Sequence, residues 1–331
     1  MIITRTPYRL SLFGGGTDYP EWFSRRPSRL VAAAMQHYCY ITVRRLPPFF
    51  SHHSRIVYSR IEDVANNRHI QHPGVVACLG HLGIDDGLEI HHDGDLPARS
   101  GIGSSSAFTV GLLLALYTLH EKAVSPQRLA AEAIHVEQNI LQEAVGIQDQ
   151  VTAAFGGMRV LDMGPDREWI SRPLVISQAY RRYFEDHVLL GFSGISRTAD
   201  QFAREKVENI RSRKTEVELR EIADMADEAI DLLQYGKDLD AIGALLHRSW
   251  IEKTKLNAAL GESHYQQIID VGLRHGAWGG KLMGAGGGGF FYFLAPPESH
   301  NDIRHALPQI KVWVPFRLDR GGSQVIFQTD Y

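Results

Sequence analysis

The stretch "DLPARSGIGSSSAFTVGLLLAL", residues 95–116, combines a proline, two glycines and four serines with an apolar run that follows without a break. A flexible linker would be flanked by polar, aperiodic sequence. Here Phe108, Leu112 and Leu116 instead recur at helical spacing. The stretch therefore predicts a tight glycine turn that opens a helix from Ser104 to about Glu121.

The start of this helix is a candidate phosphate site. The first N–H groups of a helix have no intrahelical partner, and the helix dipole adds partial positive charge, so the two together favour an anion. Gly101 and Gly103 would let the backbone approach the ligand closely. An ordinary capped helix is the alternative. No lysine follows the last glycine as in a Walker A loop, and Ser106 replaces the third glycine of a dinucleotide fingerprint.

A second signal is a glutamate on the apolar face of the next predicted helix. This helix is expected to begin at Ser125-Pro126, a cap followed by proline, and to run to about Glu143. At about 100° per residue, Glu137 falls in the middle of the apolar arc. Unpaired buried carboxylates are rare, so a cation or ligand is expected beside it. Mg²⁺ fits, because it commonly takes one or two protein oxygens plus phosphate oxygens.

Composition excludes several classes of protein. The 331 residues suffice for one large or two medium domains. A net charge of −3 argues against nucleic-acid binding. Two cysteines, Cys39 and Cys78, are too few for a disulfide framework. The longest nearly apolar run, Phe108 to Leu119, is too short to cross a bilayer. We expect a cytoplasmic protein without nucleic-acid or membrane partners.

The order of predicted elements indicates an α+β fold. Strand patterns lie at Ile3–Leu12, Leu30–Val43, Ser54–Tyr58, Gly157–Leu161 and Val188–Phe192. Helices are expected from Thr198 to about His275, followed by the strands "FFYFL", "VWVPFRL" and "SQVIFQ". Strands with two helices, then helices with strands, predict two α+β lobes with a cleft between them.

Three motifs resemble those of the GHMP kinases, in that family's order and spacing. They are "TPYRLSLFGGGTDYP" (6–20), "LPARSGIGSSSAF" (96–108) with "GIQDQ" (146–150), and "KLMGAGGGGFFYFL" (281–294). We interpret the third as a backbone turn packed against the nucleotide loop. The resemblance implies an N-terminal ribosomal-S5-like α/β lobe, residues 1–180. It also implies a C-terminal ferredoxin-like α+β lobe, residues 181–331, with the active site between the two.

The resemblance also implies roles for single residues. Asp149 would act on the anomeric hydroxyl of a sugar as a base or orienting group, and Arg9 would lie between Asp149 and the transferring phosphate. Ser105 and Glu137 would hold Mg²⁺. Asp18 would bind sugar hydroxyls.

Further residues are expected to bind ATP or the sugar. The ATP-binding set is Pro97, Ser100, Gly101, Ile102, Gly103, Ser104, Ser105 and Ser106. The sugar-binding set is Gly15, Gly16, Thr17, Asp18, Asp149, Gly156, Arg197 and Thr198. Galactokinases carry a Glu-His pair where this chain has Gly15-Gly16, so room for a longer sugar tail is expected here. Arg197 and Thr198, at a predicted helix start, are the preferred site for a phosphate carried by the sugar.

Details such as "FGGGTDYPEWF", "GIQDQVTAAFGG" and "GFSGISRTADQ" are most similar to the D-glycero-D-manno-heptose-7-phosphate kinases. That similarity implies ATP-dependent phosphorylation of the C1 hydroxyl to give a 1,7-bisphosphate, for nucleotide-activated heptose and surface polysaccharide. An L-fucose or other hexose 1-kinase is one alternative, and a non-catalytic sugar and ATP sensor is another. The presence of Asp149 and Arg9 disfavours the sensor, and "GTDYP" disfavours a mevalonate-type kinase. A homodimer is left open.

Overall fold

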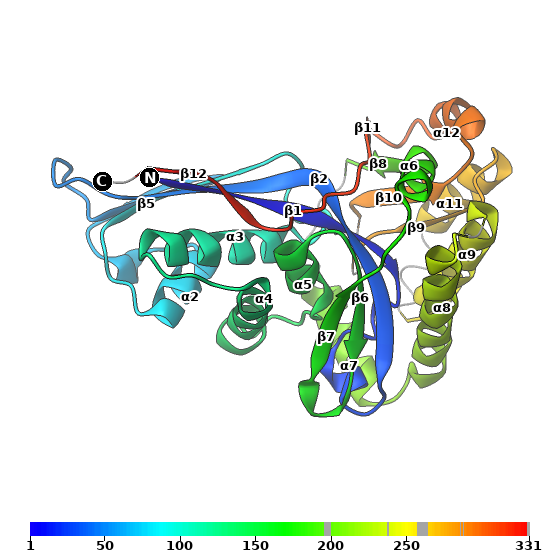
Figure 1. The fold of residues 1–331 in the computed structure, drawn as a ribbon, viewed down its shortest axis with the longest axis horizontal. Helices are drawn as coiled ribbons and strands as arrows, with labels where there is room; N and C mark the ends of the chain where they lie inside the picture. Colours follow the sequence, from blue (N-terminus) through cyan, green and yellow to red (C-terminus); the bar gives the residue numbers. More distant parts are fainter. Residues whose placement is uncertain (195–199, 237, 257–263, 285, 287, 330–331) are drawn as a thin grey trace.

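The helix predicted after the glycine turn is the central helix of the first lobe. In the computed structural model, α3 (Ser104–Leu119) packs on strands β1 (Ile2–Phe13) and β2 (Ser28–Arg45) (Figure 1). Other helices cover the rest of its surface: α2 (Pro73–Leu82), α4 (Pro126–His135) and α5 (Gln148–Phe155). Protein on all sides explains why this helix is apolar around nearly its whole circumference. The structure describes residues 1–329 apart from 195–199, 237, 257–263, 285 and 287.

The first lobe is built on a mixed sheet of eight strands. The order is β12-β1-β2-β5-β3-β4, with β6 paired to β2 and β7 paired to β6. The further strands are β3 (Ser54–Val57), β4 (Ile61–Val64), β5 (Leu88–Gly94), β6 (Met158–Met163), β7 (Trp169–Pro173) and β12 (Gln324–Gln328). The last strand returns to the first lobe, because Gln328 of β12 pairs with Ile2 of β1. The strands predicted before residue 60 and at 157–161 are confirmed.

The second lobe holds four antiparallel strands in the order β11-β8-β10-β9. The strands are β8 (Val188–Phe192), β9 (Gly279–Leu282), β10 (Phe290–Leu294) and β11 (Val312–Val314). A short helix, α1 (Pro20–Phe23), lies at the lobe boundary. The further helices described after β7 are α6 (Gln178–Asp186), α7 (Asp200–Arg211), α8 (Glu216–Gln234), α9 (Leu239–Lys255), α11 (His264–Arg274) and α12 (His300–Ala306). Phe291 and Phe293 of β10 and Trp250 of α9 share one buried cluster. No helix among the described residues has the length and apolar character of a membrane span.

The two lobes meet at the end of β1. The Lys281 ammonium on β9 donates to the Leu12 carbonyl at 2.7 Å, and the Tyr292 hydroxyl on β10 donates to the Ser11 carbonyl at 3.2 Å. All four groups are buried, so these bonds are shielded from water. They fix the glycine turn that follows β1 against the second lobe.

The predicted helix over 126–143 ends earlier than expected. Ser125 does cap α4, since its hydroxyl accepts from the Arg128 N–H at 3.2 Å. After His135, however, the chain forms one π-helical turn, Val136–Ile140, closed by Leu141 N–H donating to the Val136 carbonyl at 2.9 Å. The Gln138 amide then donates to the Val145 carbonyl at 2.9 Å and holds the departing chain. Such π-turns occur often at functional sites.

Candidate active site

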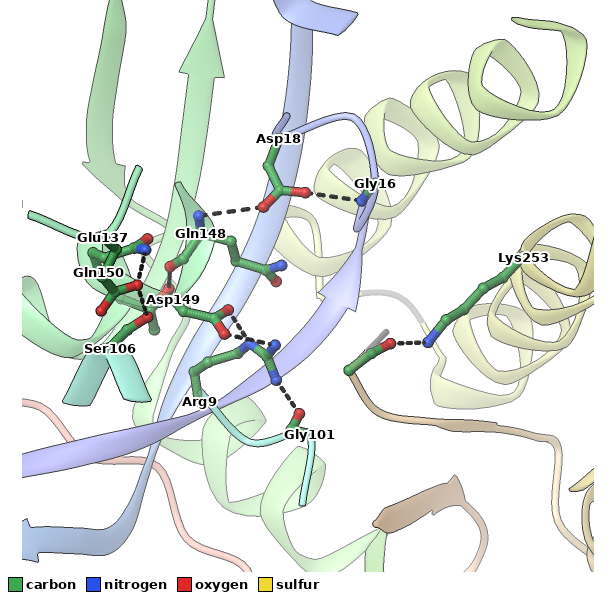
Figure 2. Close-up of polar contacts among 12 residues, drawn as sticks. Arg9, Gly16, Asp18, Gly101, Ser106, Glu137, Gln148, Asp149, Gln150 and Lys253 are labelled. Carbon is green, nitrogen blue, oxygen red and sulfur yellow. Dashed lines mark hydrogen bonds and ion pairs between the residues drawn. The ribbon is translucent and has the colours of Figure 1, made fainter. Parts of the chain in front are cut away.

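The sequence motifs converge on one cavity between the lobes. Its volume is about 440 Å³, and its walls come from both lobes. The first-lobe wall includes Arg9, Gly15, Gly16, Asp18, Gly101, Gly103, Ser104, Ser105, Ser106, Gln148 and Asp149. The second-lobe wall includes Lys206, Ser249, Lys253, Lys281, Gly284, Gly286 and Gly288. Figure 2 shows Arg9, Asp149 and Gly101 on one side of this space and Lys253 on the other.

The nucleotide loop has the backbone geometry of an anion site. Gly103 is the N-cap of α3 in a left-handed conformation (φ +72°), and no side chain caps the helix. Its first N–H groups are thus available to a ligand. Gly101 also has positive φ, and a Cβ there would lie 2.8 Å from the Met283 carbonyl oxygen. A Cβ on Gly289 would lie 2.2 Å from the Ser100 carbonyl oxygen, so the third motif packs directly on this loop.

Arg9 and Asp149 form a bidentate ion pair at the mouth of this loop. Arg9 Nε donates to Asp149 Oδ1 at 2.5 Å, Nη2 donates to Oδ2 at 3.0 Å, and Nη1 donates to the Gly101 carbonyl at 2.5 Å (Figure 2). A Cβ on Gly103 would lie 3.0 Å from Asp149 Oδ2, so glycine leaves room for the carboxylate. The Asp149 side chain remains 26% exposed, toward the cavity. The pair thus presents a carboxylate and a guanidinium side by side to a ligand.

Two opposing effects set the proton affinity of Asp149. Burial raises the pKa of its carboxyl above the ordinary value, and the Arg9 guanidinium acts in the opposite direction. The net shift is upward. Arg9 favours the ionised form, but it does not outweigh burial before ligands bind.

Glu137 is buried, as its helical phase predicts, with 0% of its surface exposed. Its Oε2 accepts from the Ser106 hydroxyl at 2.8 Å and from the Gln150 amide at 2.6 Å, while Oε1 has no hydrogen-bond partner in the described chain. Burial raises the pKa of Glu137 to about 8. Ser105, the serine that the sequence names for the metal site, also lines the cavity. Successive residues turn by about 100° on a helix, so Ser106 faces inward and Ser105 is exposed.

These groups fit a magnesium ion. A carboxylate oxygen that lacks a donor, beside a hydroxyl on the cavity wall, is the hard oxygen set that Mg²⁺ prefers. Among the described residues there is no cluster of three or more His, Cys, Asp or Glu side chains that could hold a metal. Glu137 and the serines at the start of α3, Ser105 and Ser106, would therefore be the protein's contribution to such an ion.

Asp18 is fixed by backbone donors in the turn after β1. Its Oδ1 accepts from the Gly16 N–H at 2.9 Å and its Oδ2 from the Gln148 N–H at 3.3 Å (Figure 2). A Cβ on Gly146 would lie 1.9 Å from Oδ2, so that position requires glycine. Asp18 therefore lines the cavity as an oriented, buried carboxylate that is bonded to Gln148, the residue before Asp149.

Several predicted site residues lie behind the cavity wall. The Ser100 hydroxyl donates to the Pro97 carbonyl at 2.6 Å, and the Thr17 hydroxyl donates to the Gly14 carbonyl at 2.8 Å. Ile102 is buried, and its carbonyl accepts from the Arg9 N–H at 3.1 Å. These residues shape the two loops from behind.

Gly156 lies elsewhere, and two predicted residues cannot be placed. A Cβ on Gly156 would lie 2.0 Å from the Gly322 nitrogen, so this glycine is needed for backbone packing at the end of α5 and does not contact the cavity. Arg197 and Thr198 fall outside the described residues.

Three lysines on the second-lobe wall carry most of its charge. Lys253 Nζ donates to the carbonyls of Leu282 and Gly284, each at 2.7 Å. Burial lowers the pKa of Lys253 and of Lys206, and lowers that of Lys281 to about 7. From the sequence, no role is predicted for Lys206. A lone lysine in an amphipathic helix looks like solvated surface, so no local signal marks it.

Comparison with known proteins agrees with this geometry. Residues 70–157 match the GHMP kinases N terminal domain and residues 218–311 match GHMP kinases C terminal, together more than half of the chain. The chain is 26% identical over 318 residues to D-glycero-alpha-D-manno-heptose 7-phosphate kinase of Campylobacter jejuni, covering 92% of this chain and 93% of that protein.

Two further similarities are more distant. The chain is 22% identical over 332 residues to a bifunctional fucokinase/GDP-fucose pyrophosphorylase of Arabidopsis thaliana, covering 92% of this chain but 31% of that protein. The fold matches a crystal structure of a D-glycero-D-manno-heptose 1-phosphate kinase from Bacteriodes thetaiotaomicron over 100% of both chains, with a TM-score of 0.80 and 21% identity. The chain therefore belongs to the GHMP kinase superfamily and is an ATP-dependent phosphotransferase that acts on an alcohol group.

Proposed function

We propose that this chain phosphorylates the anomeric C1 hydroxyl of D-glycero-D-manno-heptose 7-phosphate, giving the 1,7-bisphosphate and ADP. The observation that carries the proposal is the Arg9–Asp149 pair, held 2.5 Å apart beside the amides that begin α3. A relative with this activity in its name aligns over 92% of the chain. We place the reaction in the cytoplasm, in the synthesis of nucleotide-activated heptose for surface polysaccharide.

The reaction requires positioning and charge neutralisation more than covalent chemistry. The C1 oxygen forms a bond to the γ-phosphorus, the bond from that phosphorus to the bridging oxygen breaks, and ADP leaves. Asp149 accepts the proton of the C1 hydroxyl or orients that hydroxyl, a role typically worth about 10²–10⁴-fold in rate. Arg9 stabilises the γ-phosphoryl oxygens. Glu137 would hold Mg²⁺ together with Ser105 and Ser106, and the ion would supply charge neutralisation to the triphosphate when it is bound.

The experiment is an ADP-release assay with heptose 7-phosphate, mannose, L-fucose and galactose, followed by phosphorus NMR of the product. Heptose 7-phosphate should give the highest kcat/KM, with a new phosphate on C1. Preferential turnover of L-fucose would support the alternative that the fucokinase similarity favours. ATP and sugar binding without ADP release from any acceptor would support a non-catalytic sensor.

A further inference from the structure

The cations that line the cavity differ in the hydrogen bonds that they already make to the protein. Arg9 is committed to Asp149 and the Gly101 carbonyl. Lys281 donates to the Leu12 carbonyl, and Lys253 donates to two carbonyls of the glycine turn. Lys206, half-buried on α7, donates no hydrogen bond to any described residue, although it lines the same cavity. Among the cavity's buried or half-buried cations within the described chain, it is the one whose donors are free for a ligand.

Lys206 lies at the end of the cavity formed by the turn after β1. Its Nζ is 3.6 Å from the position that a Cβ on Gly16 would take, and 5.3 Å from the centroid of the Tyr19 ring. Burial disfavours its charge, and the Asp18 carboxylate favours it. The space expected from the missing side chain at Gly16 is therefore not empty, because an ammonium group and Leu219 border it.

The direction of the bound sugar follows from the carboxylates. In Figure 2, Asp149 lies between Asp18 and the Gly101 loop. A sugar with its C1 hydroxyl at Asp149 and its C1 facing the nucleotide loop would pass Asp18 with its ring hydroxyls. Its far end would then reach Gly16 and Lys206. A half-buried ammonium with unused donors at that position is suited to an anion, because charge-assisted hydrogen bonds are the strong ones.

We propose that Lys206 binds the phosphate on the far end of the sugar and thereby selects phosphorylated over unphosphorylated substrates. This inference rests on the proposed function in one respect, that the substrate carries a second phosphate. Gly16 contributes to this phosphate site, because a side chain at this position would contact the Lys206 ammonium and Leu219. The alternative is a structural role, in which the charge of Lys206 only balances Asp18.

The test compares Lys206→Met and Lys206→Arg with a matched control, Lys255→Met. Lys255 is an exposed lysine of the same lobe, ion-paired with Glu252 at 2.6 Å. Each variant is assayed with D-glycero-D-manno-heptose 7-phosphate and with unphosphorylated D-glycero-D-manno-heptose. Heptose 7-phosphate binding without ATP is measured by calorimetry, and melting temperatures verify folding.

The methionine variant should lose about ten- to a hundred-fold in kcat/KM for the phosphorylated sugar, mostly through KM. Its activity on unphosphorylated heptose should change by less than about threefold, since the variant removes only the charge at the far end. The arginine variant should recover most of the loss, and Lys255→Met should resemble the wild type.

The possible failures are distinguishable. Equal losses on both sugars would overturn the inference in favour of a structural role and leave the proposed function intact. A wild type that prefers unphosphorylated sugars would also overturn the inference. If heptose 7-phosphate is not turned over but another sugar phosphate is, with discrimination that depends on Lys206, the inference stands and the proposed function falls.

Discussion

The two walls of the cavity are built differently. In the first lobe, Asp149 and Asp18 on the cavity wall and Glu137 buried behind it each accept at least two hydrogen bonds. The donors are Arg9 for Asp149, backbone N–H groups for Asp18, and Ser106 and Gln150 for Glu137. On the second-lobe wall, the charges are lysines whose pKa values burial lowers. The carboxylates of the first lobe are each held by two donors before any ligand binds. On the second-lobe wall, Lys253 and Lys281 donate to backbone carbonyls, but Lys206 donates to no described residue and is free for an anion. We infer that the first wall determines the chemistry and the second determines which anions bind.

The most severe test of this division is Asp149→Asn, which preserves shape and removes the negative charge. We expect kcat to fall by about 10²–10⁴-fold, because the group that accepts the proton of the C1 hydroxyl is lost. ATP affinity should change by less than about threefold, since nucleotide binding is assigned to the amides of the α3 N-terminus. Steady-state kinetics and ATP titration measure both.

The pH profile supplies a second readout for Asp149. Its carboxyl must be ionised to act, and burial raises its pKa, so wild-type kcat/KM should fall on acidification at a pH above the ordinary aspartate range. Asp227→Asn, in an exposed pair with Arg29, is the control and should leave the profile unchanged. A wild-type rate for Asp149→Asn would contradict the base role.

Glu137→Gln should have the next largest effect, with opposite consequences for activity and stability. Turnover at limiting Mg²⁺ should fall about 10–100-fold, because a carboxylate ligand is lost. Without Mg²⁺ the variant should melt several degrees higher than the wild type at pH 8. The folded-state pKa of Glu137, about 8, lies above its unfolded value, so ionisation destabilises the wild type progressively as pH rises from about 4.5 to 8.

The matched control is Glu132→Gln on α4, the helix that precedes the π-turn of Glu137. Burial acts to raise the pKa of Glu132, but hydrogen bonds from Tyr117 and Arg128 lower it below its ordinary value. The ionised form of Glu132 therefore stabilises the fold at pH values above the ordinary glutamate pKa. Glu132→Gln loses this contribution and should melt lower than the wild type at pH 8. Scanning calorimetry at pH 5.5 and pH 8 separates the two variants. A destabilised Glu137→Gln protein at pH 8 would contradict the assignment of Glu137 as a buried carboxylate whose charge is unfavourable without a metal ion.

Lys253→Met tests how the glycine turn is held. The substitution removes the donor to the Leu282 and Gly284 carbonyls, and a buried group left without a partner costs about 1–3 kcal/mol. We expect a lower melting temperature and a KM for ATP raised by up to about tenfold, because the turn packs on Gly101. Unchanged ATP kinetics would show that the turn is rigid without this lysine.

The contrast between the walls also explains what could be predicted from sequence. The first wall is encoded locally: a glycine turn that opens an apolar helix, and a glutamate whose helical phase is wrong for the surface. The start of α3 at Ser104 agrees with the prediction. That Ser106 rather than Ser105 faces Glu137 depends on how the π-turn carrying Glu137 packs against α3, which is tertiary structure. The second wall depends on tertiary packing. Lys206 belongs to the site only because α7 packs against the turn containing Gly16 and Tyr19.

The smallest expected effect concerns Lys281. Its pKa is lowered to about 7, first by burial and then by the Arg9 and Lys206 charges, so the ammonium loses its proton as pH rises through neutrality. Because Lys281 lines the cavity, we expect ATP to bind more tightly when this ammonium is charged, so the dissociation constant of ATP should rise severalfold between pH 6 and pH 8.5. Lys281→Arg keeps its charge over this range and should flatten the dependence. Calorimetry at the two pH values measures the difference, and an equally steep dependence in the arginine variant would assign the pH effect to another group on the second wall.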